Sequence, residues 1–300
     1  MVKTNKDKLV EISVVGEIAS PLTGGIINTY DGQAKILPQV GGITYNVKVG
    51  DYAMGLQADH VEPGVSITNK EPVKGYRSAN DALNIYSCVG NEARVITGDA
   101  KGDKGIVTGK HGGIEHVIID FPDETLENMA IGDKIQIKAY GTGLELPDFP
   151  HVKAMNIDPK LLDHFIVKRK HETGILLLKV ASNVHAKFMG SGLGSTYAHR
   201  GDYDVQTFDP KAVKDFKLDK LRFGDLVAII DADHSYGRIY KEGAMSIGVV
   251  VHSDCVMAGH GPGIMTILTT SKPGGIENIV DRDANIGKYL NIGRYRTKKK

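Results

Sequence analysis

Leu9-Val-Glu-Ile-Ser-Val-Val15 is the first of several short runs rich in valine and isoleucine, each bounded by Gly, Pro or Asp. Gly41-Gly-Ile-Thr-Tyr-Asn-Val-Lys-Val49 and Gly64-Val-Ser-Ile67 repeat the pattern. β-Branched residues favour strands, whereas Gly, Pro and Asp favour the turns between strands. Residues 1–88 are therefore predicted to form an antiparallel β domain.

The later part of the chain continues this pattern. Ile131-Gly-Asp-Lys-Ile-Gln-Ile-Lys138 alternates, and Gly174-Ile-Leu-Leu-Leu-Lys-Val-Ala181 is a continuous apolar run that predicts a buried core strand. Ile264-Met-Thr-Ile-Leu-Thr-Thr270 predicts another strand. The expected fold class is mainly β, with short-stranded antiparallel sheets, small barrels and few short helices.

Two segments predict those helices. One runs from Ser78 to Tyr86, with Ser78 or Asn80 as the N-cap. The other begins at Pro159 and extends toward Lys168, with Asp158 as its N-cap, because proline is favoured at the first helical position.

Composition indicates a soluble cytoplasmic protein of two or three domains. The chain has 300 residues, a formal net charge of +1 and two cysteines, Cys88 and Cys255. Such a balance gives no bias toward nucleic acid or a membrane, and the distant cysteines fit a reducing compartment. The N-terminus is too charged for a signal peptide. The expected domains are residues 1–88, 89–146 and 147–300, with a Gly/Pro-rich linker at 141–150.

The segment from Gly90 to Ile119 resembles the KOW motif, in which a strand, a Gly/Lys loop and a second strand belong to an SH3-like barrel. The resemblance implies such a barrel over residues 89–146. Many proteins of that superfamily bind RNA, and a small cationic edge is available from Lys101, Lys104, Lys110, His111 and His116. Neighbouring acidic residues nearly balance this charge, and aromatic residues for stacking are missing. A structural barrel is therefore favoured over an RNA reader.

Chemically versatile side chains gather between Gly190 and Gly263. Asp202 and Asp204 occupy alternate positions, so an extended segment would turn both carboxylates to one side. Asp202, Asp204 and His234 are predicted to bind a divalent metal, with zinc preferred and manganese or iron as alternatives. The competing interpretation is that these Asp residues cap turns and that the histidine packs in the core.

Other residues are expected around this metal. His260 and Asp233 are predicted catalytic residues. His60, His199, Gly259 and Gly261 are predicted to contact the substrate, because glycine-rich loops expose backbone N–H groups. The loop around His60 could equally be a surface turn. Cys255 is predicted to be a buried core residue rather than a nucleophile.

The runs His199-Arg-Gly-Asp-Tyr-Asp204 and Asp231-Ala-Asp-His234 resemble motifs of the acetamidase/formamidase family. This resemblance implies amide hydrolysis. The chain differs from the family at Asp202, which replaces an asparagine, and after His234, where Ser235-Tyr-Gly-Arg238 contains no glutamate.

The whole chain also resembles an uncharacterised two-part domain-of-unknown-function family of anaerobic and thermophilic prokaryotes. Gly41-Gly-Ile-Thr-Tyr-Asn-Val47, Asp59-His-Val-Glu-Pro-Gly64 and Gly259-His-Gly-Pro-Gly263 carry this resemblance. It implies a mostly β fold with an inserted small barrel.

These observations predict a metal-dependent hydrolase acting on an amide or a similar small polar substrate. The alternative is a non-catalytic protein that contacts RNA or a ribonucleoprotein through the KOW-like barrel and the basic tail, Arg294–Lys300, although a solvated tail is the simpler interpretation. We expect a small-molecule substrate, no nucleic acid and no membrane partner. A homo-oligomer is also expected, in which His60 or His111 of one chain could reach the site of another.

Overall fold

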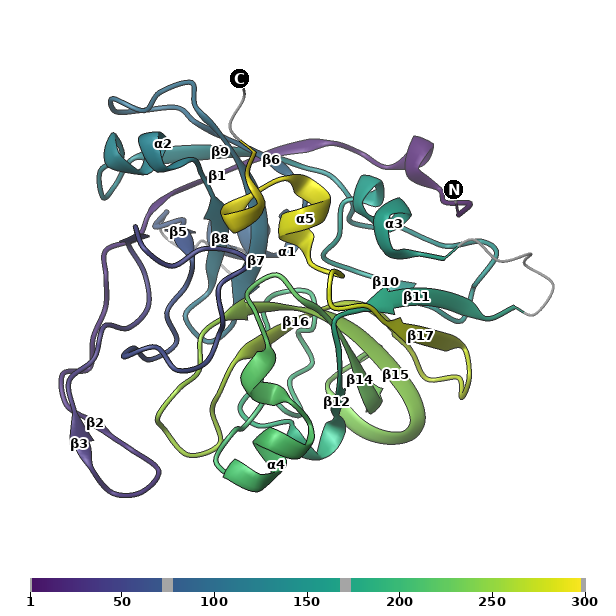
Figure 1. Cartoon of the computed structure of the whole chain (residues 1–300). Coiled ribbons are helices and arrows are strands. Elements are labelled where there is room, and N and C mark those ends of the chain that lie inside the picture. The colour runs from purple at the N-terminus through teal and green to yellow at the C-terminus, as the bar shows by residue number, and fades with distance from the viewer. Residues whose placement is uncertain (1, 72–77, 168–173, 298–300) are drawn as a thin grey trace.

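The computed structural model describes residues 2–71, 78–167 and 174–297, and this part of the chain is mainly β, as the sequence predicts (Figure 1). A closed barrel, formed by the first half of the chain, lies beside a second sheet formed by the second half. Short helices surround these two bodies of strands. Among the described helices, none combines the length and apolar character needed to cross a bilayer.

The barrel contains six antiparallel strands. In spatial order they are β1 (Ile12–Ile18), β9 (Lys134–Ala139), β6 (Glu92–Val95), β7 (Lys104–His111), β8 (His116–Asp120) and β5 (Gly64–Thr68). Strand β5 pairs back with β1, which closes the barrel, and β4 (Ile43–Thr44) pairs with β5. Because side chains alternate along each strand, Val107, Ile135 and Ile137 point inward and are fully buried.

The barrel takes strands from both sides of residue 88. Strands β1 and β5 precede this residue, whereas β6 to β9 follow it. Strands β6 and β7 form the expected strand, loop and strand, with Gly98 and Gly102 at positive φ in the connecting loop. They share one six-stranded barrel with β1 and β5, so residues 89–146 do not close a barrel by themselves.

The second sheet lies across the second half of the chain. Its strands, in spatial order, are β10 (Lys153–Ala154), β16 (Gly263–Thr270), β15 (Ile239–His252), β14 (Leu226–Asp233) and β12 (Ser182–His185), with β13 (Tyr203–Asp204) also paired to β16. Neighbouring strands are antiparallel except β12 and β14, which are parallel.

The predicted core strand is confirmed as β11 (Leu176–Val180). Leu176, Leu178 and Val180 are buried, and the strand pairs in parallel with β17 (Ile276–Val280). Its partner lies about a hundred residues later in the chain. An apolar run does not indicate whether so distant a strand pairs with it in parallel or antiparallel orientation. Most pairs of named strands are antiparallel, as expected, and the parallel ones are β11 with β17 and β12 with β14.

The helices are short, as expected. They are α1 (Ala79–Tyr86), α2 (Asp123–Glu127), α3 (Pro159–Phe165), α4 (Pro210–Asp215) and α5 (Ile286–Leu290). Ser78 caps α1 by accepting a hydrogen bond from the Asp81 N–H, at 2.9 Å. Asp158 caps α3 by accepting from the Lys160 N–H, also at 2.9 Å. Lys168, the predicted end of that helix, lies outside the described residues.

The remaining elements are small. Strands β2 (Ile27–Asn28) and β3 (Ala34–Lys35) form a hairpin that extends away from both bodies of strands (Figure 1). The 3-10 turns are η1 (Lys6–Lys8), η3 (Ala186–Phe188), η4 (Leu218–Lys220) and η5 (Gly293–Tyr295).

The barrel and the second sheet share a tightly packed junction. A Cβ on Gly109 of β7 would lie 2.3 Å from Val251 Cγ1 on β15, and a Cβ on Gly201 would lie 2.4 Å from Gly112 Cα. Only glycine permits such close approach at these positions. Apolar residues from both halves, such as Ile118 and Met265, belong to one core. The two halves therefore hold each other's loops in fixed positions.

The C-terminal segment contacts the barrel, so it is not simply a solvated tail. Arg294 forms an ion pair with Asp51, at 2.7 Å, and its N–H donates to Val49 O. Arg296 forms an ion pair with Asp120. Residues 298–300 of the predicted basic tail lie outside the described residues.

Asp120 gives a pH-dependent contribution to stability. Burial raises the pKa of this carboxyl to about 6, although Arg296 opposes the rise. Because the folded pKa exceeds the unfolded value, the folded state holds the proton more tightly, and stability is lost as pH rises from about 4 to 6. Asp120→Asn should therefore gain up to about 3 kcal/mol relative to the unmodified chain between pH 4 and 7. Urea unfolding midpoints of both proteins across this range would check the difference, and a constant difference would contradict it.

Candidate metal centre

Six side chains converge where the barrel meets the second sheet. We call them the inner cluster: His60, His111, Asp202, Asp204, His252 and His260. His60 lies in the loop before β5, and His111 ends β7, so both come from the barrel. Asp204 lies on β13 and Asp202 directly precedes it, while His252 ends β15 and His260 lies in the loop that follows. Five of the six are buried, and the His260 side chain is 30% exposed.

Asp202 and Asp204 face the same side, as their alternate spacing predicts. Asp202 Oδ2 lies 2.7 Å from His252 Nε2, and Asp204 Oδ1 lies 3.3 Å from the same nitrogen. The second oxygen of Asp202 accepts a hydrogen bond from the Gly112 N–H, at 2.7 Å. The barrel backbone thus fixes a carboxylate that belongs to the second half of the chain.

His60 and His260 meet the other oxygen of Asp204. His60 Nε2 lies 3.3 Å and His260 Nδ1 lies 2.8 Å from Asp204 Oδ2, and the two nitrogens are 3.1 Å apart. His60 has a φ of +56°, an uncommon conformation that sets its ring toward the cluster. Three potential ligand atoms therefore lie within 3.3 Å of one another.

The outer nitrogens of three histidines contact hydrogen-bond acceptors. His60 Nδ1 faces Asp59 Oδ2 at 3.0 Å, His111 Nδ1 faces Glu62 Oε1 at 2.7 Å, and His252 Nδ1 faces the Ser253 carbonyl at 2.9 Å. A carboxylate or a carbonyl only accepts, so each Nδ1 carries hydrogen. Neutral rings in this tautomer present the Nε2 lone pair inward, the arrangement that metal-binding histidines show.

Glu62 is the buried acceptor that orders the barrel side of the cluster. It accepts hydrogen bonds from His111, His116, Ser66 and the Gly41 N–H. Burial alone would raise the pKa of Glu62, but the bonds from His111 and His116 hold it well below the ordinary value. The carboxylate therefore stays charged and keeps both rings oriented.

These contacts correct the expected cationic edge. His111 and His116 are buried against Glu62. Lys110 is fully buried, with its Nζ donating to Asn156 Oδ1 and to His199 O at 2.8 and 2.9 Å. These side chains cannot meet a phosphate backbone, because the packing between the halves covers them.

Two atoms of the inner cluster are buried without a hydrogen bond. Asp202 Oδ2 and His252 Nε2 lie close together, yet their contact lacks hydrogen-bond geometry. A Cβ on Gly263 would lie 2.0 Å from the first atom and 2.1 Å from the second. Glycine therefore leaves open the small space that these two atoms face, as a cation-binding site requires.

The electrostatics of the cluster favour positive charge. Burial alone would lower the pKa of His60, but hydrogen bonds to Asp204 and Asp59 raise it to about 11. Burial likewise opposes protonation of His252, yet Asp202 and Asp204 raise its pKa well above the ordinary value. The pKa values of Asp202 and Asp204 are lowered by the histidines despite burial. Protons on imidazoles or a bound cation can both supply this charge.

Cys255 lies beside the cluster. It is 3% exposed, and its Sγ is within 4.8 Å of ligand nitrogens of His60 and His260. Burial raises the pKa of its thiol to about 11. The residue is buried, as predicted, and the position of its sulfur beside two histidines is a feature that the sequence did not indicate.

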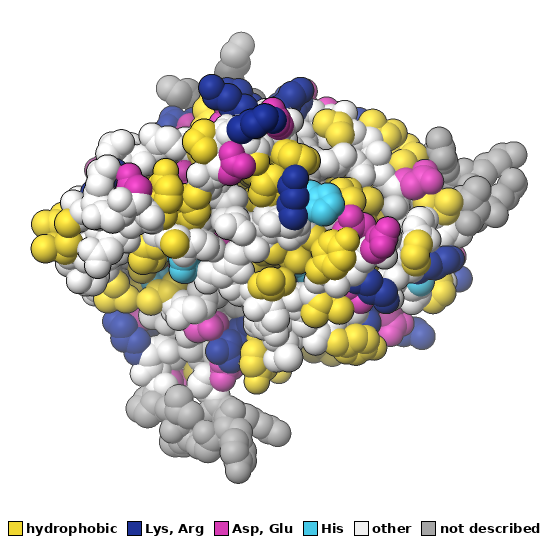
Figure 2. Space-filling model, turned by 90° about the horizontal axis from the view of Figure 1, so that it is seen from below, with side chains coloured by type: hydrophobic (Ala, Val, Ile, Leu, Met, Phe, Trp, Pro, Cys, Tyr) yellow, Lys and Arg dark blue, Asp and Glu magenta, His cyan; other side chains and the backbone are white. Residues whose placement is uncertain are grey.

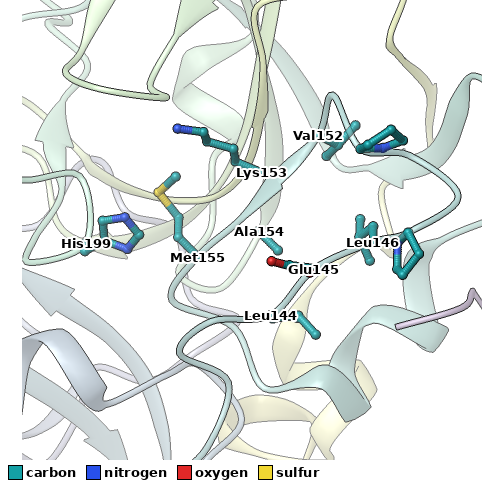
Figure 3. A pocket seen from close by; sticks show the side chains of 10 residues that line it. Leu144, Glu145, Leu146, Val152, Lys153, Ala154, Met155 and His199 are labelled. Carbon is teal, nitrogen blue, oxygen red and sulfur yellow. The ribbon is translucent and has the colours of Figure 1, made fainter. Parts of the chain in front are cut away.

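Three predicted site residues lie elsewhere. His234 is buried, and its Nδ1 contacts Thr266 Oγ1 at 2.7 Å while its ring packs against Tyr203. Burial lowers the pKa of His234 to about 3. Asp233 accepts a hydrogen bond from the Ser235 N–H at 2.9 Å and so caps a turn. His199 lines a separate cavity of about 420 Å³ beside Met155 (Figure 3).

Gly259 and Gly261 contribute to packing. The Gly259 carbonyl accepts from the Ser191 N–H at 2.8 Å, and a Cβ on Gly190 would lie 2.0 Å from that carbonyl. A Cβ on Gly261 would lie 1.9 Å from Val205 O. Gly190 and Gly261 therefore allow the loop that carries His260 to lie directly on neighbouring backbone, whereas a Cβ on Gly259 would have nothing within 4 Å.

A small polar cavity reaches the two aspartates. It has a volume of about 180 Å³, and its walls include Ser191, Asp202, Asp204 and Arg238. Arg238 is 3% exposed, and its Nη2 donates to Gly201 O at 2.8 Å. The cavity near His199 is larger, but its walls contain none of the inner cluster. Of these two cavities, the smaller is the one that reaches the candidate centre.

The sequence placed His111 at the site only through a homo-oligomer, and it assigned no ligand or supporting role to His252 or Glu62. A shared signal exists, because His111, His260 and the Asp202 segment all adjoin glycines in loops at strand ends. Glycine at such positions permits close backbone approach between loops.

The fold and the cluster define a class of protein: a two-part β protein whose halves meet at a buried centre of histidines and carboxylates. The chain belongs to the DUF4438 family. Its residues 27–163 match the model described as "Domain of unknown function (DUF4438), N-terminal", and residues 166–290 match the corresponding C-terminal model. The predicted two-part domain-of-unknown-function family is thereby confirmed.

A solved structure titled "Crystal structure of TM1086" is similar to this chain. The two are 47% identical with a TM-score of 0.90, and the match covers 96% of this chain and 99% of that one. The comparison with curated proteins finds no match. The resemblances to acetamidase/formamidase and to KOW segments are not confirmed by these findings.

Retaining Glu62 should be necessary for tight metal binding. Glu62→Gln replaces an acceptor with an amide group that cannot accept from all four donors, so His111 and His116 lose their fixed orientation. Metal affinity should fall roughly 10–100-fold. Titration with zinc by calorimetry would measure the change, with surface-exposed Glu92→Gln as the control. Equal affinity in both variants would contradict this role.

Proposed function

We propose that this protein is a metal-dependent hydrolase that acts on an amide or a similar small polar substrate. The inner cluster holds the divalent metal, with zinc as the first choice and manganese or iron as alternatives. Imidazole and carboxylate groups together suit these three ions. His252 and His111 take the ligand role that the sequence assigned to His234.

The orientation of the histidines is the observation that carries the proposal. Each of His60, His111 and His252 has its Nδ1 against an acceptor, and the Nε2 atoms of His60 and His252 lie 3.3 Å from Asp204 oxygens. Histidines that serve only in packing have no need for several rings to present lone pairs toward shared carboxylates. Metal-binding sites require this arrangement.

The small cavity supports a small polar substrate. Its volume of about 180 Å³ suits a molecule of a few heavy atoms, and it leads to Asp202 and Asp204. His260 is the most exposed member of the cluster, although it lies outside the walls of this cavity. Arg238 ties the Gly192 and Gly201 carbonyls together and so fixes the wall beside Asp202.

When bound, a divalent ion would polarise a carbonyl group and lower the pKa of water. The protein's own groups then have defined parts. Asp202 is held by the Gly112 N–H, His252 is oriented by Ser253 O, and the buried walls exclude bulk water. Such preorganisation is the main contribution that a protein makes to this chemistry.

Elemental analysis combined with an assay of ammonia release from small primary amides tests the proposal. We expect bound metal after exposure to zinc, manganese or ferrous iron, and hydrolysis that stops when a chelator removes it. Asp204→Ala should lose both properties, whereas Asp233→Ala should keep them, because Asp233 only caps a turn. If the protein binds none of the three ions, the proposal is wrong.

The surface gives the RNA-binding alternative no specific support. On the face shown in Figure 2, Lys and Arg side chains are interspersed with acidic, hydrophobic and uncharged ones. Lys104 is paired with Glu92 at 3.0 Å, and Lys110 is buried. Homo-oligomerisation stays a prediction. His60 and His111 reach the cluster within one chain, so its geometry does not require a second copy.

A further inference from the structure

The ligand atoms near the junction fall into two groups. Those of His111, Asp202 and His252 lie within 4.8 Å of one another, and so do those of His60, Cys255 and His260. Ligand atoms on one ion are separated by at most two bond lengths, roughly 4.0–4.6 Å for nitrogen, oxygen and sulfur on zinc. Each group is therefore compact enough for one ion after small adjustments.

Asp204 lies between the two groups and uses a different oxygen for each. Its Oδ1 is 3.3 Å from His252 Nε2 in the first group. Its Oδ2 is 3.3 Å from His60 Nε2 and 2.8 Å from His260 Nδ1 in the second. A carboxylate with one oxygen directed to each group could bridge two ions about 3.5–4 Å apart.

Four carboxylates are buried at and around the junction. Asp59, Glu62, Asp202 and Asp204 are each at most 5% exposed. Among the described residues, their ion-pair partners within 4.0 Å are all histidines, with no Lys or Arg. Four buried carboxylates carry four negative charges, and buried charges need partners or metals. Two divalent ions would balance them while the histidines stay neutral.

We propose that the centre holds two divalent ions bridged by Asp204. The first is bound by His111, Asp202 and His252, and the second by His60, His260 and Cys255. This inference rests on the proposed function, since both ions occupy the inner cluster, and it makes His260 a metal ligand with one exposed edge.

The two positions differ in chemistry. The first offers imidazole and carboxylate groups, which suit zinc, manganese and iron alike. The second adds the Cys255 sulfur, which favours softer ions such as zinc or iron over manganese. Two ions together would activate the attacking water and polarise the carbonyl oxygen of an amide, whose C–N bond then breaks to release ammonia or an amine. The walls of the small cavity include Asp202 of the first position and the bridging residue Asp204.

Cobalt titration of the full chain, freed of metal by a chelator, tests the proposal. We expect two Co²⁺ ions per chain by elemental analysis and a thiolate-to-cobalt charge-transfer band in the near ultraviolet. Cys255→Ser should abolish that band and weaken the second ion at least tenfold while the first ion stays bound. Cys88→Ser is the matched control, because Cys88 is also buried but lies outside both groups. It should leave the band and the count unchanged.

The outcomes separate this inference from the proposed function. One ion per chain with no thiolate band would overturn the second site and leave a single-metal centre intact. No bound ion would overturn both. Thermal unfolding of each variant would show that the chain is folded, and His260→Ala, which should lose the second ion and the band's intensity, supplies an independent variant if Cys255→Ser does not fold.

Discussion

His252→Ala should abolish tight metal binding, whereas His234→Ala should leave it intact. His252 Nε2 lies 2.7 Å from Asp202 and 3.3 Å from Asp204, and its ring is fixed by Ser253 O. Loss of a residue that only orients a ligand weakens metal binding roughly 10–100-fold, and loss of the ligand His252 itself should weaken it more. Zinc titration of the apoprotein by calorimetry, with elemental analysis after dialysis, would measure the difference.

The pair is informative because both rings are fully buried and both lie in the second half of the chain. Both variants should lose stability, about 1–3 kcal/mol for each buried partner left without its hydrogen bond. Only His252→Ala should lose metal as well. Metal loss in His234→Ala with retention in His252→Ala would reverse our assignment and restore the ligand set predicted from the sequence.

Gly263→Ala should have an equally large effect although it removes no ligand. The added methyl group would lie 2.0 Å from Asp202 Oδ2 and 2.1 Å from His252 Nε2, where a bound ion would contact both. These side chains are buried and held by Gly112 N–H and Ser253 O, so neither can move freely. We expect metal affinity to fall at least about a hundredfold, which is more than is usual when a residue that only orients a metal ligand is replaced.

Gly24→Ala provides the control for this substitution, because nothing lies within 4 Å of a Cβ there. Circular dichroism would show whether Gly263→Ala keeps its β structure. A folded Gly263→Ala protein that binds zinc as tightly as the unmodified chain would show that the ion does not lie between Asp202 and His252.

The strands were predictable from local pattern, but their partners were not. The valine-rich run at Leu9–Val15 overlaps β1, and the apolar run at Gly174–Ala181 contains β11. Strand β1 pairs with β9, more than a hundred residues later, and this pairing crosses the boundary predicted at residue 88. Hydrophobic alternation specifies which face of a strand is buried, and it carries no information about which strand lies beside it.

The site shows the same division. Asp202 and Asp204 were found because alternate residues of an extended segment share one side, which is a local rule. His234, predicted for the same group, lies apart from the inner cluster, and a register shift interrupts the preceding strand β14, where Asp231 has a φ of +63°. The irregularity separates Asp231 from Asp233, and His234 then points toward Thr266. His252 was overlooked because it follows a run of valines, which are buried, and such a run is typical of a core strand.

The residues of the candidate metal centre come from both halves of the chain. His60 and His111 belong to the segment that matches the N-terminal family model, while Asp202, Asp204, His252 and His260 belong to the segment that matches the C-terminal one. Neither segment expressed alone would contain all the ligands of the inner cluster. Any metal bound here would join the two segments. Because binding to the folded chain stabilises it, release of the metal would lower the free energy of unfolding of the whole chain.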